Sequence, residues 1–336
     1  MKRRTLATKA AVLACGLLLV LGGVFWTSSA SAETYPDKPI KLICPYGAGG
    51  TTDLAARTLS AAIPEFLGQP VVVINRPGAS GSIAFDFMTK QKPTGYTMFM
   101  AAIGTNAMYT AMNPNLPFKW SDLVYVARTQ INPNMLVVSA KSPWKTFQDF
   151  AKDLKAHPGK YKYSTAGPGV TSHLGAVLIL EALGLPLNAA HAVHYNSDGQ
   201  AVLAVIQGEV DFFQANLAPM DGHVKSGLVR GLAVTTKERL PDHKGVPTYT
   251  ELGYPSVNVI GWRGVCGPPG TPPAVIKAWE AAVKKTVASK YWRTVVTKFG
   301  DVPGYMDSKE FTKYAGEEFK RYRALFAKLG LLMKKK

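Results

Sequence analysis

The amino-acid sequence predicts an α/β protein of two domains, and three observations lead to this prediction. Short apolar runs of strand character alternate with segments of helical spacing along most of the chain, an order typical of sheets covered by helices. The 336 residues exceed what one hydrophobic core usually holds, which favours two domains. Three glycine-rich loops each lead from a strand into a helix, and α/β folds bind ligands at such loops.

The first 32 residues are expected to be an export signal that is removed from the mature protein. Four basic residues stand within the first nine positions, an apolar run covers 10–25, and small residues before position 33 suit cleavage after Ala32. The apolar run is shorter than the roughly 20 residues of a membrane span, and Gly22 and Gly23 interrupt it. Cys15 lies inside the run, so lipidation is not expected.

Charge and cysteine content limit the classes of function. The formal net charge is +17, and the predicted export signal contributes four of the positive charges. Basic residues are spread along the chain, so we expect attraction of small anions and no nucleic-acid binding. After cleavage only Cys44 and Cys266 remain, both in apolar runs, and they are expected to be buried thiols, with a disulfide as the alternative. No Cys or His spacing indicates a metal site, and no cofactor is expected.

The first domain is expected to comprise residues 33–133 and 258–300. Its first predicted strands are Ile40–Cys44, Val71–Ile74, Thr97–Ala102 and Val124–Ile131, with helices at Leu54–Phe66 and Ser82–Gln91 between them. This β-α-β-α order predicts a parallel sheet with helices on both faces.

Residues 134–257 are expected to form the second domain from a further set of strands and helices. The predicted strands are Met135–Ser139, Tyr161–Ser164, Ala192–Tyr195, Val210–Gln214 and Val229–Thr235. The predicted helices are Thr146–Ala156, Ser172–Leu183, Gly199–Gln207 and Pro219–Ser226. Gly184 directly follows the second of these helices, as a glycine cap does.

The last part of the chain returns to the first domain and is then helical. Val259–Cys266 is a long apolar strand, and the prolines of the following GPPGTPP suit the first turn of a helix. The predicted helices are Ala274–Ser289, Tyr291–Phe299 and Ser308–Leu329. Residues 301–336 are expected to pack across both domains as a C-terminal helix.

The first glycine-rich loop has the features of an anion-binding site. The strand ends at Pro45, the bare turn Gly47–Gly50 follows, and Thr51–Asp53 begin a helix. The first N–H groups of a helix have no partner within it, and the helix dipole is positive there. Glycines let an anion approach these N–H groups closely.

Two further loops share this arrangement. The loop Asn75–Ser82 ends in Ser80, Gly81 and Ser82, which stand at the start of a helix. The loop Ser164–His173 leads into the helix predicted from Ser172 in the second domain. Three such loops predict a ligand with carboxylate or phosphate groups. The nucleotide-binding patterns are absent, because no GxxxxGK[ST] run exists and a threonine replaces the third glycine of GxGxxG. The acidic Asp53 would repel a phosphate, so a carboxylate is favoured.

A serine hydrolase is the alternative function. It would be an exported enzyme that uses Ser80 or Ser82, with triad partners among His173, His191, His194 and Asp211. The string GASGS lacks the last glycine of GxSxG, so we assign no catalytic residue.

Six motifs occur in an order that resembles the periplasmic solute-binding receptors of tripartite tricarboxylate transporters, the Bug-type extracytoplasmic receptors. They are YPDKPIKLICPYGAGGTTDLAAR, VINRPGASGSIA, YSTAGPGVTSHL, VHYNSDGQAVLAVIQGEVDFF, VKSGLVRGLAVTTKERLPDHKGVPTYTELGY and GWRGVCGPPGTP. The resemblance implies a periplasmic-binding-protein (Venus flytrap) fold with two mixed or parallel sheets and a ligand cleft between the domains. It implies a monomer that binds a carboxylate and docks on the transporter's membrane subunits or a sensor kinase.

The resemblance also implies which residues contact the ligand. They are Tyr46, Gly47, Ala48, Thr51 and Asp53 in the first loop, Ser80, Gly81 and Ser82 in the second, and Thr165, Ala166, Gly167, His173 and Asp211 in the second domain. The sequence departs from the family pattern at Tyr46 and Gly47, at Ala84 in place of a glycine, and at Asn196 where a lysine is common. Tyr46 and Phe85 leave an aromatic acid open beside an aliphatic di- or tricarboxylate.

Overall fold

The structure is a computed structural model that describes residues 35–298 and 300–335. The predicted export signal lies outside the described residues. Contacts divide the chain into residues 1–37 and 38–336, and every described helix and strand belongs to the second part. Within the described ranges, no helix is both long and apolar enough to cross a membrane.

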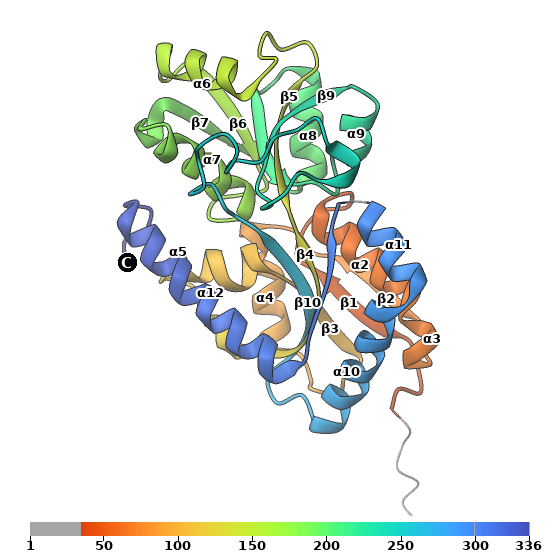
Figure 1. The fold of residues 1–336 in the computed structure, drawn as a ribbon. Coiled ribbons are helices and arrows are strands. Elements are labelled where there is room, and N and C mark those ends of the chain that lie inside the picture. The colour runs from red at the N-terminus through yellow and green to blue at the C-terminus, as the bar shows by residue number, and fades with distance from the viewer. Residues whose placement is uncertain (1–34, 299, 336) are drawn as a thin grey trace, which may run out of the picture. The chain divides into compact units, whose positions relative to one another are not determined.

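The first sheet has six strands in the order β11-β4-β10-β3-β1-β2 (Figure 1). Their bounds are β1 Ile40–Cys44, β2 Val71–Asn75, β3 Thr97–Ala102, β4 Val124–Asn132, β10 Gly261–Gly267 and β11 Val302–Met306. Strand β1 is parallel to β2 and β3, whereas β10 is antiparallel to both β3 and β4. The sheet is therefore mixed: the four predicted strands β1–β4 run in one direction, but β10 lies between β3 and β4 and runs against them, as β11 does against β4. The reason is the chain path, because β10 returns from the second sheet and runs against the strands that precede it.

Helices cover both faces of this sheet (Figure 1). One group contains α2 Thr51–Ala62, α3 Pro64–Leu67, α10 Pro273–Ala288 and α11 Lys290–Lys298. The other contains α4 Ser82–Thr89, the π-helix η2 Gly104–Tyr109, α5 Thr110–Met112 and α12 Ser308–Lys328, with short turns η1 Ala79–Gly81 and η3 Trp120–Asp122. The single helix predicted for Leu54–Phe66 is two, because Pro64 has no N–H to continue the first helix.

The second sheet has five strands in the order β7-β6-β8-β5-β9. They are β5 Asn134–Ser139, β6 Tyr161–Thr165, β7 Ala190–His194, β8 Phe212–Asn216 and β9 Val229–Val234. The helices are α6 Phe147–Ala156, α7 Thr171–Ala182, α8 Asp198–Gln207 and α9 Asp221–Lys225, with turns η4 Leu187–Ala189 and η5 Pro241–His243. Successive residues of β8 face opposite sides, so Phe212 packs with α6 and α7 while Phe213 packs with α8.

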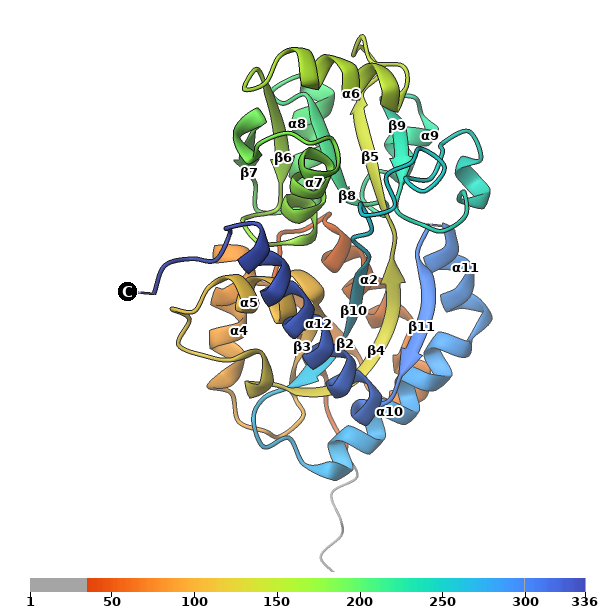
Figure 2. The ribbon, with the colours of Figure 1, turned by 60° about the vertical axis from the view of Figure 1, so that its left-hand side comes forward.

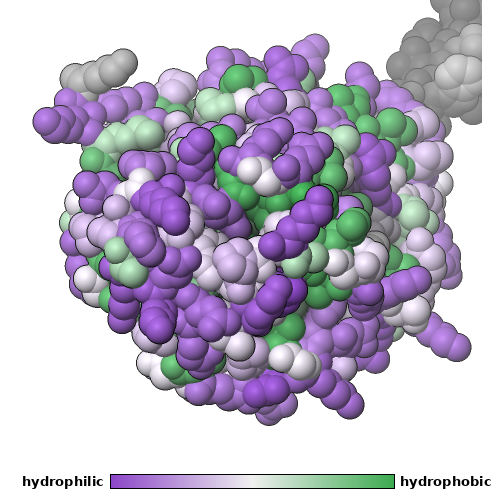
Figure 3. Space-filling model, turned by 90° about the horizontal axis from the view of Figure 1, so that it is seen from above, coloured by the Kyte–Doolittle hydropathy of each residue, from purple (hydrophilic) through white to green (hydrophobic). Residues whose placement is uncertain are grey.

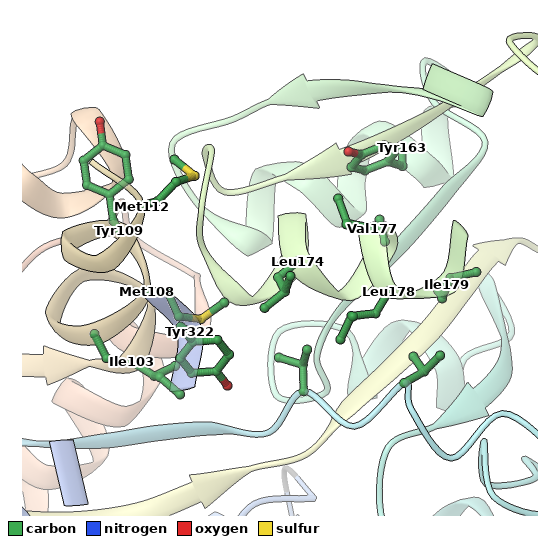
Figure 4. Close-up of a cluster of buried hydrophobic side chains, with 14 of the residues drawn as sticks. Ile103, Met108, Tyr109, Met112, Tyr163, Leu174, Val177, Leu178, Ile179 and Tyr322 are labelled. Carbon is green, nitrogen blue, oxygen red and sulfur yellow. The ribbon is translucent and has the colours of Figure 1, made fainter. Parts of the chain in front are cut away.

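The chain crosses between the two sheets at two adjacent places. Strand β4 ends at Asn132 and β5 begins at Asn134, so the two strands follow each other almost directly (Figure 2). Strand β10 begins at Gly261, which pairs with Asn132. One apolar cluster extends across the crossing: side chains of η2 and α12, such as Met108 and Tyr322, face Leu174 and Leu178 of α7 (Figure 4).

The outer surface is mostly hydrophilic. Seen from above, hydrophilic residues cover most of the visible face, and hydrophobic ones show between them in smaller groups (Figure 3).

Cys44 and Cys266 are buried and form no disulfide, which confirms the expected free thiols. Burial raises the pKa of the Cys44 thiol to about 12, so it stays protonated.

Candidate ligand-binding site

Asp53 holds the first glycine-rich loop in shape. Its Oδ2 accepts hydrogen bonds from Gly49 N and Arg57 Nε, both at 2.9 Å, and its Oδ1 accepts one from Asn75 Nδ2 at 2.8 Å. Burial acts to raise the pKa of Asp53, but the bonds from Arg57, Asn75 and Gly49 outweigh it and lower the pKa. The carboxylate is thus turned into the loop. It therefore does not cap the start of α2, where Gly50 provides no side-chain cap.

The second loop contains a strained backbone that directs Ser80 towards the second domain. Ala79 and Ser80 have φ angles of 46° and 55°, a left-handed conformation that costs free energy for residues with a side chain. Ser80 Oγ donates a 2.8 Å hydrogen bond to the carbonyl oxygen of Pro168. A Cβ at Gly167 would lie 2.6 Å from this Oγ, so the contact requires a glycine there.

The third loop is held by its own side chains. Thr165 Oγ1 accepts from Gly167 N, and Ser172 Oγ accepts from Ala166 N, both at 3.0 Å. His173 Nδ1 accepts from Gly169 N at 3.1 Å. Burial lowers the pKa of His173 to about 4, with His194 adding to the effect, so the ring is neutral and carries its proton on Nε2. His173 therefore holds the third loop in shape, whereas the resemblance implied that it contacts the ligand.

The first and third loops face each other across a narrow cavity. It is lined by Tyr46, Gly50, Thr51, Thr52, Ala102, Gly104, Ala166, Val170, Thr171, Asp198 and Arg263. A Cβ at Gly104 would lie 2.8 Å from the Tyr46 hydroxyl, so glycine leaves room for the tyrosine. The free space holds about one water molecule. The start of α2 and the third loop thus nearly touch.

Twelve of the thirteen predicted site residues fall into three groups. Tyr46, Thr51 and Ala166 line the cavity. Gly47, Ala48, Asp53, Ser80, Gly81, Thr165, Gly167 and His173 belong to the loops behind or beside it. Ser82 lines a separate hollow with Arg76 and Phe118.

Asp211 lies away from this cavity. Its Oδ2 accepts a 2.7 Å bond from Lys162 N, and it lines another hollow with Ser139 and Lys141. Asp211 precedes β8, which runs parallel to β6. The third loop follows the carboxyl end of β6, whereas Asp211 precedes the amino end of β8. Asp211 and the third loop therefore lie at opposite ends of these parallel strands.

Asp198 and Arg263 are the charged residues among the cavity residues that the sequence reasoning missed. Asp198 is 7% exposed, and its Oδ2 accepts a 2.8 Å bond from Thr51 Oγ1. Burial raises the pKa of Asp198, opposed by the Thr51 hydroxyl and the charge of Arg263. Arg263 is 3% exposed; it donates to Trp262 O at 2.8 Å and to Asn216 Oδ1 at 3.0 Å.

Each missed residue had a signal in the sequence. Asp198 begins a helix directly after the strand and turn of HYNSDG, the same pattern that marked the three loops. Arg263 is a charged residue within an otherwise apolar strand, which is uncommon unless the charge has a partner.

Direct hydrogen bonds join the loops of the two domains. Beside Thr51–Asp198 and Ser80–Pro168, Gly47 N donates to Asn196 O at 3.1 Å, and Ser197 Oγ donates to Ala48 O at 3.5 Å. A Cβ at Gly199 would lie only 2.7 Å from the carbonyl oxygen of Gly49. The loops of the two domains are thus in direct contact.

The structure gives no support to the hydrolase alternative. In the part of the chain that the structure describes, neither Ser80 nor Ser82 makes a hydrogen bond to a histidine. The same residues, 35–298 and 300–335, contain no cluster of three or more acidic, His or Cys side chains able to hold a metal ion.

The fold and the cavity together define a two-domain solute-binding protein. The family model of the tripartite tricarboxylate transporter family receptor matches residues 55–331. The chain therefore belongs to this family of receptors. It is 32% identical over 333 residues to the UPF0065 protein in the gbd 5' region of Cupriavidus necator, covering 98% of this chain and 99% of that protein. It is 30% identical to protein BugT of Bordetella pertussis, covering 95% and 97%.

Solved structures agree with this family. A chain described as a periplasmic transporter superposes with a TM-score of 0.85 at 29% identity, covering 88% of this chain and 99% of that one. MatC from Rhodopseudomonas palustris, with bound malate, gives 0.80 at 26% identity, covering 86% and 99%. Rpa4515 of R. palustris, with adipate, gives 0.84 at 26% identity, covering 88% and 98%. The family is one of periplasmic solute-binding receptors.

Proposed function

We propose that this protein is a periplasmic receptor that captures a small organic acid through its carboxylate and delivers it to a tripartite tricarboxylate-type membrane transporter. One observation carries the proposal: the cavity between the domains is lined both by the start of α2, whose N-cap residue Gly50 has no side chain, and by the buried residue Arg263. Malate and adipate, bound in two relatives of known structure, are both carboxylic acids, which supports the same class of ligand here.

The positive side of the cavity suits a carboxylate on three counts. The first N–H groups of α2 point to the cavity end of the helix, where the dipole is positive. Burial raises the pKa of the Tyr46 hydroxyl, which therefore stays protonated; it donates to Ser80 O at 3.4 Å and would turn from that oxygen to donate to a ligand. Arg263 provides a permanent positive charge with a planar set of donors that matches a carboxylate.

Capture requires a ligand that contacts both domains. Closing shifts a population, and moving it from 1:99 to 99:1 takes roughly 5.5 kcal/mol of differential binding. Several charge-assisted hydrogen bonds of about 1.5–3 kcal/mol each are enough. The chain crossings near Pro133 and Asn258 would act as hinges, and they separate the proposed domains 33–133 with 258–300 and 134–257.

The remaining parts of the proposal concern export and partners. Residues 1–32 would direct export and be cleaved, and the receptor would act as a monomer. Its closed form would dock on the membrane subunits of the transporter or on a sensor kinase. It would bind its ligand without chemical change.

A thermal-shift screen of the mature protein tests the proposal. The probes are mono-, di- and tricarboxylic acids, aliphatic and aromatic, with sugars and cations beside them. We expect at least one acid to raise the melting temperature, since saturation at about 100 Kd stabilises by roughly 2.7 kcal/mol. The melting temperature of the Ser80→Ala variant should rise with the same acid, and the variant should not consume that acid. A response only to sugars or cations would refute the ligand class, and consumption of the acid would refute the receptor role.

A further inference from the structure

The negative group in the cavity is the feature that the carboxylate proposal does not use. Asp198 comes from the start of α8 and reaches the first turn of α2 from the opposite domain. One of its oxygens, Oδ2, is held by Thr51, while Oδ1 is buried and has no partner of hydrogen-bonding geometry. Burial raises the pKa of Asp198, while the hydroxyl and backbone N–H of Thr51, the charge of Arg263 and the Ser172 hydroxyl act to lower it. An unpaired buried carboxylate oxygen costs free energy unless a donor meets it.

A second unpaired group lines the same cavity. The Nε of Arg263 is buried without a partner, although the other nitrogens of this guanidinium donate to Trp262 and Asn216. Asp198 and Arg263 attract each other through the cavity, yet no ion pair joins them directly. Two residues of opposite charge that line this cavity thus each have one buried polar atom without a partner, an acceptor on Asp198 and a donor on Arg263.

We propose that the captured acid carries an ammonium group beside its carboxylate, with the ammonium donating to Asp198 Oδ1 and the carboxylate accepting from Arg263 Nε. This inference rests on the proposed function, because it keeps the carboxylate site and adds a second contact. The Thr51–Asp198 bond is one of the direct contacts between the domains, and an inserted ligand would widen it.

Charge balance favours an amino acid over a plain acid. Asp198 and Arg263 together are neutral, and a zwitterion keeps the closed cavity neutral while pairing both groups. A plain dicarboxylate would place two further negative charges beside buried Asp198, and uncompensated buried charge is costly. A hydroxyl group could donate to Oδ1 but would not offset its charge.

Matched probes test the inference on the mature protein by isothermal titration. L-aspartate, L-malate and succinate share one carbon skeleton and differ only in an amine, a hydroxyl or a hydrogen at C2. L-glutamate, 2-hydroxyglutarate and glutarate form the five-carbon set, and L-alanine, L-lactate and propionate the three-carbon set. We expect the amino member of the best-bound set to bind at least tenfold more tightly than the other two.

The variant Asp198→Asn separates specificity from a structural role. The ratio of the amino acid's affinity to that of the unsubstituted acid should fall at least tenfold, whereas a structural loss would weaken all three acids equally. Asp211→Asn, which removes a carboxylate outside the cavity, should leave the ratio unchanged. Should Asp198→Asn not fold, the ratio in the unaltered protein decides alone.

The outcomes distinguish this inference from the function on which it rests. Tightest binding of a hydroxy or unsubstituted acid would overturn the ammonium contact and leave the carboxylate receptor standing. An unchanged ratio in a folded Asp198→Asn protein would do the same. Absence of binding by every acid, including those of the wider screen, would overturn both.

Discussion

At the scale of single residues, buried charges gather where the chain crosses between the sheets. Asp198, Arg263 and Asp301 are each less than a tenth exposed. Asp301 accepts a 2.6 Å bond from Gln130 Nε2, and its other oxygen has no partner. Burial raises the pKa of Asp301 from 3.8 to about 7, although bonds and the charge of Arg263 oppose this. Its charged form is therefore disfavoured in the folded protein.

The Asp301→Asn variant should change how stability depends on pH. A carboxyl whose pKa is raised on folding stabilises the protein when protonated, so the free energy of unfolding falls as pH rises from about 4 to about 7. Asparagine does not titrate, so the variant's gain relative to the unaltered protein should be larger at pH 8 than at pH 5. We expect the difference to be at least about 1.4 kcal/mol, the equivalent of one pKa unit. Urea unfolding at both pH values measures it, and parallel pH dependences would contradict the account.

Site residues could be predicted where the sequence pattern that marks them is short and continuous. Tyr46 and Thr51 belong to a strand–loop–helix pattern that is complete within eighteen residues, so their place at the cavity was predictable. Asp198 and Arg263 meet Thr51 and Tyr46 only through the fold, from positions far along the chain. Asp211 showed the limit of motif transfer, because proximity in sequence to a site segment did not say at which end of β8 it would lie.

At the scale of elements, the first turn of α8 packs directly against the first loop. Gly47 N bonds to Asn196 O just before this helix, and Thr51 bonds to Asp198 at its start. No side chain fits at Gly199 in the same turn, because a Cβ atom there would clash with the backbone of Gly49. Backbone atoms cannot move aside as a flexible side chain can. Closing of the domains thus depends on a glycine at this position.

The Gly199→Ala variant should bind its acid at least tenfold more weakly, because the added methyl group holds α8 away from the first loop. The fold should stay intact, since alanine favours a helix over glycine by about 1 kcal/mol. The control is Gly222→Ala in α9, where a Cβ would meet nothing within 4 Å. Titration with the acid found in the screen measures both variants. Equal affinities would show that α8 does not close on the first loop.

Most elements were predictable because their signals are local. The strands β1 and β3 and the helices that follow the glycine loops begin within a few residues of their predicted starts. The π-helix η2 was missed because its sequence, GTNAMY, has no helix-start pattern. Strand β11 was missed because VPGYM contains a proline and a glycine, which strands tolerate mainly at an edge, and β11 is an edge strand.

At the scale of the whole molecule, parts distant in sequence hold the two sheets together. The C-terminal helix α12 packs on β4, η2 and α5, and its Lys328 pairs with Glu181 of α7 at 2.9 Å. Tyr322 of α12 belongs to the apolar cluster that includes Leu178 of α7 (Figure 4). The mixed order of the first sheet follows from the same two crossings that place Arg263 beside the cavity. These relations could not be predicted from periodicity, which reports the face of an element and not its neighbours.

A crystal structure of the mature protein with the acid found in the screen tests the central claim most directly. The account predicts the carboxylate between the start of α2, the Tyr46 hydroxyl and Arg263, with donor distances of about 2.9 Å. It also predicts that residues of the third loop or α8 contact the other end of the ligand. A ligand seated instead in the hollow at Ser82 or the hollow at Asp211, with the cavity between the domains closed as it is here, would contradict the account.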